Sequence, residues 1–385
     1  MMHLKNRSAM AEFSSPSRLD RLDVITHKVW RSDDDFQSDM LERVSRTFAL
    51  TIPQLPHALC RVVSNAYLLC RIVDTIEDEP VISSARKHYF CQQFVGVLNG
   101  TKNAERFARE LAAALSSRTP AAEHELICNV PRVIQISRSF SIPERQAVQQ
   151  CVATMANGMA QFQLSNDKHG LASLQDLDRY CYYVAGVVGE MLTALFCLYS
   201  PEIAKRRDRL IRLAVCFGQG LQMTNILKDV WEDYENGSCW LPRQIFANED
   251  FDLHKLAKGE NSPQFQRGIQ RLIGVAHGHL RDALRYTLLI PRRETGIRNF
   301  CLWAIGMAVL TLHKINGHLN YTDGNQVKIS RASVKGTVTV SRLAVRHDHV
   351  LWLLFYAATL RLPLSRTQSA HSPARSNAGA LDRAV

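Results

Sequence analysis

The stretch AYLLCRIVDTIEDE, residues 66–79, decides the fold. On a helix, four of its residues recur after four, three and four positions and share one face: Tyr67, Arg71, Asp74 and Asp78. Most of the other positions are apolar. Charged groups in such surroundings are costly unless they are paired or bind a metal ion. The pattern predicts a largely buried helix with one polar stripe, although an Arg71–Asp74 ion pair on a solvated face explains it equally well.

A second stretch, GLQMTNILKDVWEDYENG at 220–237, repeats this design. Its polar face carries Gln222, Asn225, Asp229 and Asp233 at helical spacing. Two helices that each offer an aspartate pair can face one another across a cavity, where their carboxylates repel strongly unless cations lie between them. Oxygen ligands suit Mg²⁺, which keeps several waters and bridges to phosphates. The two stretches together predict a magnesium site.

The composition favours long helices and an anionic ligand. Of the 385 residues, 46% are hydrophobic and 22% charged, which excludes a disordered chain, and only 13 prolines and 19 glycines interrupt it. The net charge of +11 favours nucleic acid, anionic lipid or a phosphorylated small molecule as partner. Nucleic acid does not explain the acidic faces, so no such partner is expected. Basic residues near these faces indicate a diphosphate held through magnesium; they are Arg46, Arg71 and Lys228.

The chain is expected to fold as one domain. Residues 1–30 read as a flexible polar leader without an apolar signal segment, 31–360 as the helical domain, and 361–385 as a disordered tail. The ten cysteines form no CxxC pair and many lie in apolar runs, which predicts reduced thiols in a cytoplasmic protein rather than zinc ligands. No run reaches the roughly 20 apolar residues that a membrane span needs.

Four motifs, in this order, resemble the squalene/phytoene synthase family. They are VSRTFAL (44–50), YLLCRIVDTIED (67–78), YCYYVAGVVGEML (180–192) and QMTNILKDVWED (222–233), and the resemblance runs from about residue 35 to 335. It implies an all-α, single-domain isoprenoid-synthase helical fold with a central active-site cavity. It also implies head-to-head coupling of two prenyl diphosphates.

The resemblance implies a role for each matching position. The expected Mg²⁺ ligands are Asp74, Asp78, Asp229 and Asp233. The expected substrate-binding residues are Ser45, Arg46, Phe48, Arg71, Gln222 and Lys228. Tyr67 and Tyr180 would lie near the reacting carbons and act in catalysis together with Arg71.

A carbocation intermediate must be shielded from water, which calls for an apolar tunnel. Met155, Met159 and Phe162 form a helical stripe that either lines such a tunnel or belongs to the ordinary core. Gly186 and Gly189 lack bulk, which either lets a prenyl chain approach or serves helix packing.

The C-terminal region resembles the squalene synthases within this family. RNFCLWAIGMAVLTL (298–312) is followed by VKISRASVK (327–335), a basic segment that in those enzymes lies by the proposed NADPH phosphate site. The resemblance therefore implies a set of NADPH-binding residues, with a solvated basic face as the alternative. The set comprises Lys328 and Arg331, with Thr47 and Asn225 near the nicotinamide.

The loop NGSCWLP (236–242) is similar to that of bacterial members. Three positions depart from the pattern, since many squalene synthases have arginine at Ser238, histidine at Tyr182 and proline at Ala304. None of these changes removes an expected metal ligand.

The resemblance predicts a squalene synthase that couples two farnesyl diphosphates through presqualene diphosphate and reduces the product with NADPH. A phytoene or dehydrosqualene synthase without reduction is one alternative, and a non-catalytic relative acting as an assembly factor is another. We expect a monomer. The apolar stretch 341–362 is flanked by arginines and too short to span a bilayer, so it either lies on anionic lipid, as in a peripheral cytoplasmic protein, or caps the fold.

Overall fold

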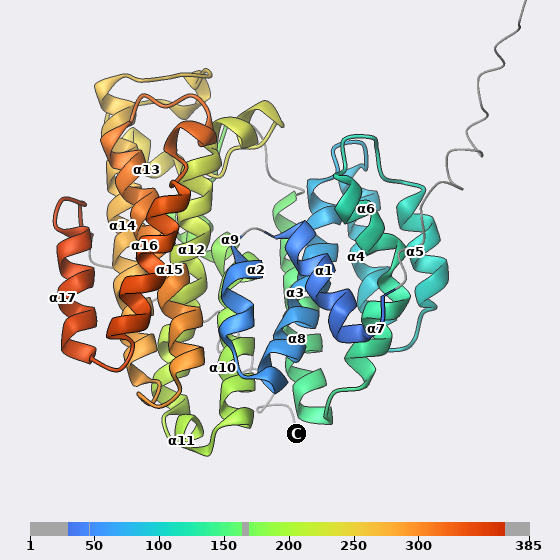
Figure 1. Cartoon of the computed structure of the whole chain (residues 1–385). Coiled ribbons are helices and arrows are strands. Elements are labelled where there is room, and N and C mark those ends of the chain that lie inside the picture. Colours follow the sequence, from blue (N-terminus) through green and yellow to red (C-terminus); the bar gives the residue numbers. More distant parts are fainter. Residues whose placement is uncertain (1–29, 46, 164–168, 366–385) are drawn as a thin grey trace, which may run out of the picture.

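The computed structural model describes residues 30–45, 47–163 and 169–365 (Figure 1). Within these ranges the chain is helical and contains no strand; Leu171 and Pro242 form an isolated parallel bridge. The predicted all-α class is confirmed. The proposed leader and most of the proposed tail lie outside the described residues, so these boundaries stay predictions.

The N-terminal helices form one group. They are α1 (Asp33–Val44), α2 (Phe48–Thr51), η1 (Ile52–Gln54), α3 (His57–Asp78), α4 (Ser84–Leu98), α5 (Ala104–Ala112), α6 (Ala121–Cys128), α7 (Val130–Arg138) and α8 (Ile142–Gln163).

The C-terminal helices form the other group. They are α9 (Leu174–Cys181), the π-helical η2 (Tyr182–Gly186), α10 (Val187–Tyr199), α11 (Pro201–Ala204), α12 (Arg207–Glu235), α13 (Arg243–Ala247), η3 (Leu253–Lys255), α14 (Pro263–Leu289), α15 (Thr295–Gly317), η4 (Gly324–Val327), α16 (Arg331–Ala344) and α17 (Asp348–Thr359).

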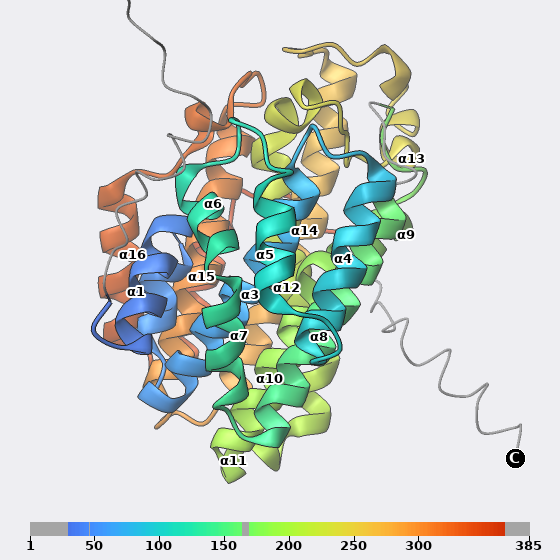
Figure 2. The same ribbon diagram turned by 90° about the vertical axis from the view of Figure 1, so that its right-hand side faces the viewer.

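The two groups lie side by side and share one core (Figures 1 and 2). Helix α8 packs on α3, α4 and α10, while α12 packs on α10, α14 and α15. The larger of two hydrophobic clusters in the described residues runs from Phe36 of α1 through Leu68 of α3 to Phe300 of α15, and the smaller lies under α16 and α17. The described residues therefore form one domain, as predicted.

Helix α3 has the inverted pattern that its sequence predicts. Its apolar residues from Leu68 to Ile76 are buried, several of them completely, because neighbouring helices cover three sides of the helix. Arg71 and Asp74 are only half-buried and lie on the remaining side. The stripe of Met155, Met159 and Phe162 on α8 is buried in the core.

The glycines near α10 serve helix packing. A Cβ on Gly189 of α10 would lie 2.1 Å from the carbonyl oxygen of Ala214 on α12. A Cβ on Gly218 of α12 would lie 2.0 Å from the carbonyl oxygen of Ala185 in η2. The two backbones are therefore in direct contact, which fixes α12 against the core.

Two helical stretches are long and apolar enough to cross a membrane by length and composition alone: Leu174–Tyr199 and Thr295–Gly317. The sequence analysis expected no such stretch, because it counted uninterrupted apolar residues. Each of these two stretches contains a few polar residues and is still apolar on average. In their most apolar windows, 56% and 72% of the residues are buried inside the protein. Both stretches contribute to the core described above.

Gly189→Ala should lower the free energy of unfolding by about 3 kcal/mol, since the new Cβ overlaps backbone that cannot move without shifting α12. Gly336→Ala on α16 is the matched control, because no atom lies within 4 Å of its Cβ position. The control should instead gain about 0.5–1 kcal/mol from helix propensity. Urea denaturation measures both, and equal effects would contradict the packing argument.

Candidate active site

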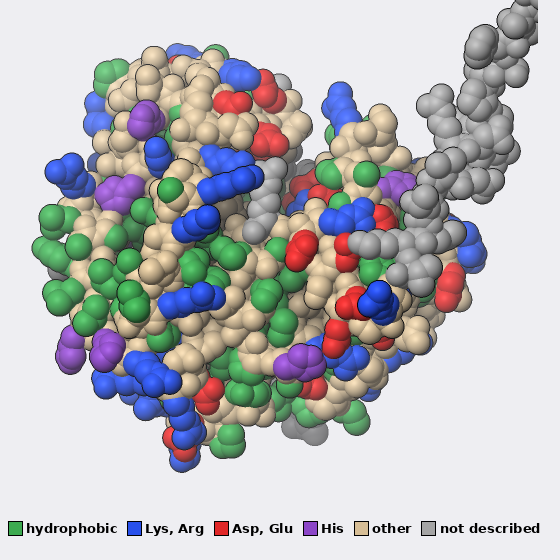
Figure 3. All heavy atoms as spheres, in the orientation of Figure 1, with side chains coloured by type: hydrophobic (Ala, Val, Ile, Leu, Met, Phe, Trp, Pro, Cys, Tyr) green, Lys and Arg blue, Asp and Glu red, His purple; other side chains and the backbone are tan. Residues whose placement is uncertain are grey.

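A cavity of about 620 Å³ lies between α3 and α12. The molecular surface is hollowed between the two groups of helices (Figure 3). Many of the cavity-lining residues are ones that the sequence singled out: Arg71, Asp78, Tyr180, Gln222, Asn225, Asp229 and Asp233. The two acidic stripes thus face one space, as their spacing predicts.

Arg71 is the centre of the α3 side. Its guanidinium lies 3.7 Å from Asp74 and 4.0 Å from Asp78, and its shortest contact, 2.5 Å, is to Glu123 of α6. Glu123 is 7% exposed and also accepts a hydrogen bond of 3.2 Å from the Thr75 hydroxyl. The intrahelical Arg71–Asp74 pair therefore exists, but it belongs to a partly buried network rather than to a solvated face.

The first aspartate pair is held in an unfavourable environment for charge. Burial raises the pKa of Asp74 to about 7; Arg71 opposes this, while Asp78 and Glu123 add to it. The pKa of Asp78 is also raised by burial, against the pull of Arg71. For Arg71, burial lowers the pKa, but the combined attraction of Asp74, Glu123 and Asp78 outweighs it and keeps the guanidinium charged.

The second aspartate pair also lies in an environment that is unfavourable for charge. Burial raises the pKa of Asp233 to about 7, with further contributions from Asp229 on the same helix and Asp78 across the cavity. The pKa of Asp229 is raised by burial and held back by Lys228, whose Nζ lies 3.0 Å from its carboxylate. Because Asp78 acts on Asp233 across the cavity, the two pairs form one electrostatic unit.

These residues fit Mg²⁺ bound together with a phosphate ligand. Among the described residues, no three His, Cys, Asp or Glu side chains are gathered closely enough to hold a metal ion by themselves. Mg²⁺ commonly takes one or two carboxylates, several waters and substrate phosphates. Burial, with the neighbouring carboxylates, raises the pKa values of Asp74 and Asp233, and bound cations would stabilise their charged forms.

The two predicted tyrosines have different surroundings. Tyr180 lines the cavity, where its ring stacks on Trp240 at 3.7 Å between centroids, and Phe162 packs against its edge at 5.5 Å. Tyr67 instead packs on Phe48 at 5.2 Å and donates a hydrogen bond of 3.4 Å to the Val44 carbonyl. Burial raises the pKa of both phenols, so both stay neutral near pH 7.

Ser45 and Thr47, before α2, do not line the cavity, and Arg46 lies outside the described residues. Ser45 is buried and its Oγ accepts a hydrogen bond of 3.0 Å from the Phe48 amide, while Thr47 is exposed. Phe48 packs against Tyr67, and neither Ser45 nor Phe48 lines the cavity.

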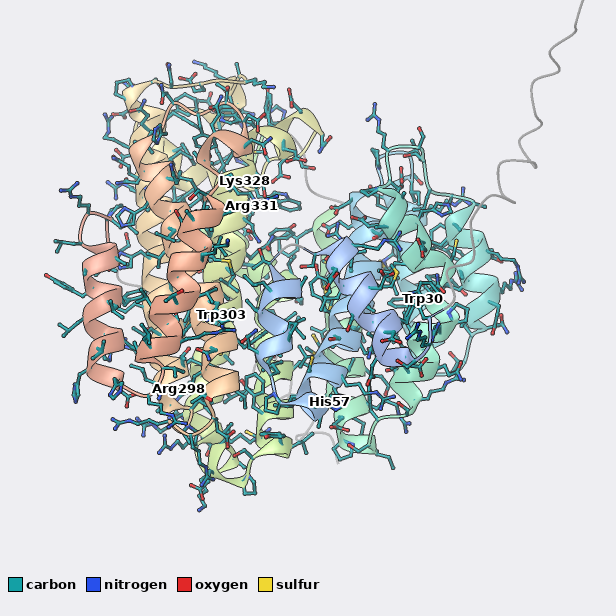
Figure 4. The ribbon with its side chains drawn as sticks, in the orientation of Figure 1. Trp30, His57, Arg298, Trp303, Lys328 and Arg331 are labelled. Carbon is teal, nitrogen blue, oxygen red and sulfur yellow. The ribbon has the colours of Figure 1, made fainter. Side chains whose placement is uncertain are left out.

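The basic C-terminal segment begins beside the second acidic helix. A Cβ on Gly324 of η4 would lie 3.1 Å from Asp229 Oδ1, and Trp231 of α12 donates a 2.6 Å hydrogen bond to the Tyr321 carbonyl. Lys328 and Arg331 are exposed and lie next to each other at the start of α16 (Figure 4). They do not line the cavity.

Several cavity residues were missed by sequence reasoning. They are Glu123, Lys87, Arg118 and Trp240. Glu123 lies in AAEHELIC, which has no recognisable motif, and only the packing of α6 on α3 brings it to Arg71. Trp240 stands in the loop NGSCWLP, where its aromatic side chain was the available signal.

Without divalent cations, the free energy of unfolding should fall as pH rises through about 7. The carboxyls of Asp74 and Asp233 have pKa values near 7 in the folded chain against an ordinary 3.8, so the folded state binds more protons in that interval. Asp74→Asn and Asp233→Asn should each flatten this slope in chemical denaturation from pH 5 to 8. Asp176→Asn should leave it unchanged, because the pKa of Asp176 is lowered. An unchanged slope in both cavity variants would contradict the assignment.

Comparison with known proteins gives the same family as the motifs. The squalene/phytoene synthase profile matches residues 41–333. "Squalene synthase ERG9" of Candida albicans is 31% identical over 310 residues, which cover 79% of this chain and 66% of that protein. "Squalene synthase ERG9" of Gibberella zeae is 26% identical over 348 residues, covering 84% and 72%. Both relatives are fungal, so the similarity to bacterial members stays a prediction.

Solved structures show the same fold. TcSQS in complex with a ligand has a TM-score of 0.66 at 23% identity, covering 86% of this chain and 91% of that one. A dehydrosqualene synthase in complex with a ligand has a TM-score of 0.56 at 20% identity, covering 84% and 96%. The predicted isoprenoid-synthase helical fold is thus confirmed. On the profile match, which spans most of its length, the chain belongs to the squalene/phytoene synthase family.

Proposed function

We propose that this chain is a squalene synthase that joins two farnesyl diphosphates head to head through presqualene diphosphate and reduces the intermediate to squalene with NADPH. The observation that carries the proposal is the pair of acidic helix faces, on α3 and α12, that line one cavity together with Arg71. The relatives described above are named as squalene synthases.

The cavity residues suit an allylic diphosphate as substrate. Three basic side chains line the wall and can attract the two diphosphates: Arg71, Lys87 and Arg118. Bound Mg²⁺, held by Asp74, Asp78, Asp229 and Asp233, would stabilise the negative charge on the departing diphosphate. Gln222 and Asn225 offer amide groups on the same face of α12.

The aromatic wall suits a carbocation. Trp240 and Tyr180 present stacked rings to the cavity, and ring faces attract cations without reacting with them. Of the two tyrosines proposed to assist proton removal as the cyclopropane closes, Tyr180 is better placed because it lines the cavity. Tyr67 lies behind Phe48 with its hydroxyl bonded to Val44, which favours a supporting role.

The reductive half would use residues near η4 and α12. NADPH, held by Thr47, Asn225, Lys328 and Arg331, would supply the hydride that quenches the rearranged cation. Asn225 lines the cavity, whereas Lys328 and Arg331 are exposed on the side of α12 that contacts η4. An exposed basic pair of this kind suits the phosphate of a dinucleotide. Ser238, where many squalene synthases have arginine, also lines the cavity.

A non-catalytic role is the less favoured alternative. Carboxylates whose pKa is raised by burial and mutual repulsion destabilise the fold, and an assembly factor has no need of them. We further propose a cytoplasmic monomer without a nucleic-acid partner. All ten cysteines lie in the described residues and none of them forms a disulfide bond, as suits a reducing compartment.

Product analysis tests the proposal. Purified protein with farnesyl diphosphate and Mg²⁺ should form squalene only when NADPH is present. Lys328→Gln should raise the KM for NADPH about tenfold or more, since a charge-assisted hydrogen bond is worth about 1.5–3 kcal/mol, and the exposed Lys335→Gln is its matched control. Dehydrosqualene in both reactions would place the chain on the non-reducing branch, and full turnover by Asp74→Ala would overturn the metal role.

Glu123→Gln should lower kcat/KM for farnesyl diphosphate about tenfold, an effect of about 1.4 kcal/mol. The amide keeps the volume but loses the charge that holds Arg71 away from Asp74 and Asp78. Glu125→Gln on the same helix is the control, because Glu125 makes an equally short ion pair of 2.5 Å with Arg43. Steady-state kinetics measure both variants, and equal losses would show that Glu123 serves α6 packing alone.

A further inference from the structure

A second pocket, with a volume of about 520 Å³, lies among α4, α7 and α8. These three helices belong to the N-terminal group and face the viewer in Figure 2. The pocket shares no lining residue with the cavity between α3 and α12. Its volume falls within the roughly 300–1,000 Å³ that small-molecule sites occupy in proteins. The pocket is therefore large enough for a small organic ligand.

Two arginines give this pocket a positive charge. Arg138 is the last residue of α7 and is exposed, while Arg145 lies near the start of α8 and is half-buried. Within the described part of the chain, neither guanidinium forms an ion pair, and none of the residues that line the pocket is acidic. The carboxylate of Glu144 instead accepts hydrogen bonds of 2.9 and 2.6 Å from the amide and hydroxyl of Ser141. Both arginines are therefore available to an anion.

A serine hydroxyl beside the arginines is also available. Ser137 lines the pocket and is 4% exposed. A serine inside a helix commonly donates to the carbonyl four residues earlier. Here that carbonyl, of Val133, accepts a hydrogen bond of 3.0 Å from the side-chain amide of Asn65. Among the described residues the Ser137 hydroxyl has no hydrogen-bond partner, so it can donate to a ligand.

The pocket is pre-formed and partly apolar. The side-chain amide of Gln149 on α8 donates a hydrogen bond of 2.7 Å to the Leu98 carbonyl at the end of α4, which fixes the two helices against each other. Leu98 and Ile134 add apolar surface to the wall. Gly100 follows α4 with a φ of 76°, and no atom lies within 4 Å of the position that a Cβ would take there. The pocket thus offers cationic, polar and apolar groups to one ligand.

We propose that this pocket binds a small phosphate monoester. Arg138 and Arg145 contact the phosphate oxygens, because guanidinium groups match phosphate geometry and bind it through paired N–H donors. The Ser137 hydroxyl donates to a third oxygen, and Leu98 and Ile134 contact the organic group. A phosphate dianion balances both arginines, whereas a carboxylate leaves one positive charge unbalanced. The site goes beyond the proposed function and does not depend on it, since the two cavities share no residue.

Calorimetric titration of the full chain with phenyl phosphate, without divalent cations, tests the proposal. Phenyl phosphate should bind about fivefold more tightly than inorganic phosphate, which lacks the apolar group, and than benzoate, which carries a single charge. The double variant Arg138→Gln, Arg145→Gln should weaken binding about tenfold or more, since it removes charge-assisted hydrogen bonds. Arg106→Gln with Arg109→Gln is the matched control, because both residues are exposed on α5 and neither lines the pocket. The control should bind as the unchanged chain does.

A further variant separates this pocket from the cavity between α3 and α12. Arg71→Gln, in that cavity, should leave the affinity for phenyl phosphate unchanged, and circular dichroism checks that every variant is folded. Affinity lost in Arg71→Gln but kept in the α7–α8 double variant would place the ligand in the other cavity and overturn the proposal. Equal affinities of the double variant and its control, or no saturable binding by the unchanged chain, would also overturn it. Turnover of farnesyl diphosphate is measured separately, so failure of the proposed function leaves this test valid.

Discussion

Repulsion between carboxylates on α3 and α12 is the constraint on which the rest of the structure depends. Asp78 of α3 raises the pKa of Asp233 of α12 across the cavity, and burial raises both. Helices that repel one another at their functional faces must be held together elsewhere. The backbone contacts at Gly189 and Gly218 fix α12 on α10 and η2, and α3 is buried on its other sides. The close packing of these helices thus compensates for the unfavourable interactions between the carboxylates that line the cavity.

The basic side chains near the site do not fully balance the negative charge of the aspartate pairs. Arg71 makes its shortest contact with Glu123, and its attraction to Asp74 does not outweigh the effect of burial on the pKa of that carboxyl. Lys228 lies next to Asp229, and Asp233 keeps a pKa near 7 despite it. The remaining negative charge attracts cations in a cavity that also contains Lys87 and Arg118. A ligand that carries phosphates and divalent cations together satisfies both sets of residues.

Sequence spacing predicted the parts of the site that lie on single helices. Positions three and four apart share a helix face whatever surrounds them, which is why the stripes of α3 and α12 could be recognised. That spacing rule does not predict which side chains of different helices come into contact. Glu123 meets Arg71 only because α6 packs on α3. Tyr67 differs from Tyr180 because its hydroxyl bonds to Val44 of α1 and its ring packs on Phe48 of α2. Equivalent side chains in the sequence become distinct through tertiary packing.

Helices α3 and α17 depart from ordinary patterning in opposite directions. In α3 a charged stripe interrupts an otherwise buried apolar helix, and in α17 an apolar stripe takes the place of a solvated one. Each departure opposes folding, so each is retained only where another force compensates. For α3, the proposed function supplies that force through the binding of cations and phosphate. In α17, the ion pair with the buried Arg298 neutralises Asp348, which is the single acidic residue of 341–362. The apolar face is therefore left with positive ends.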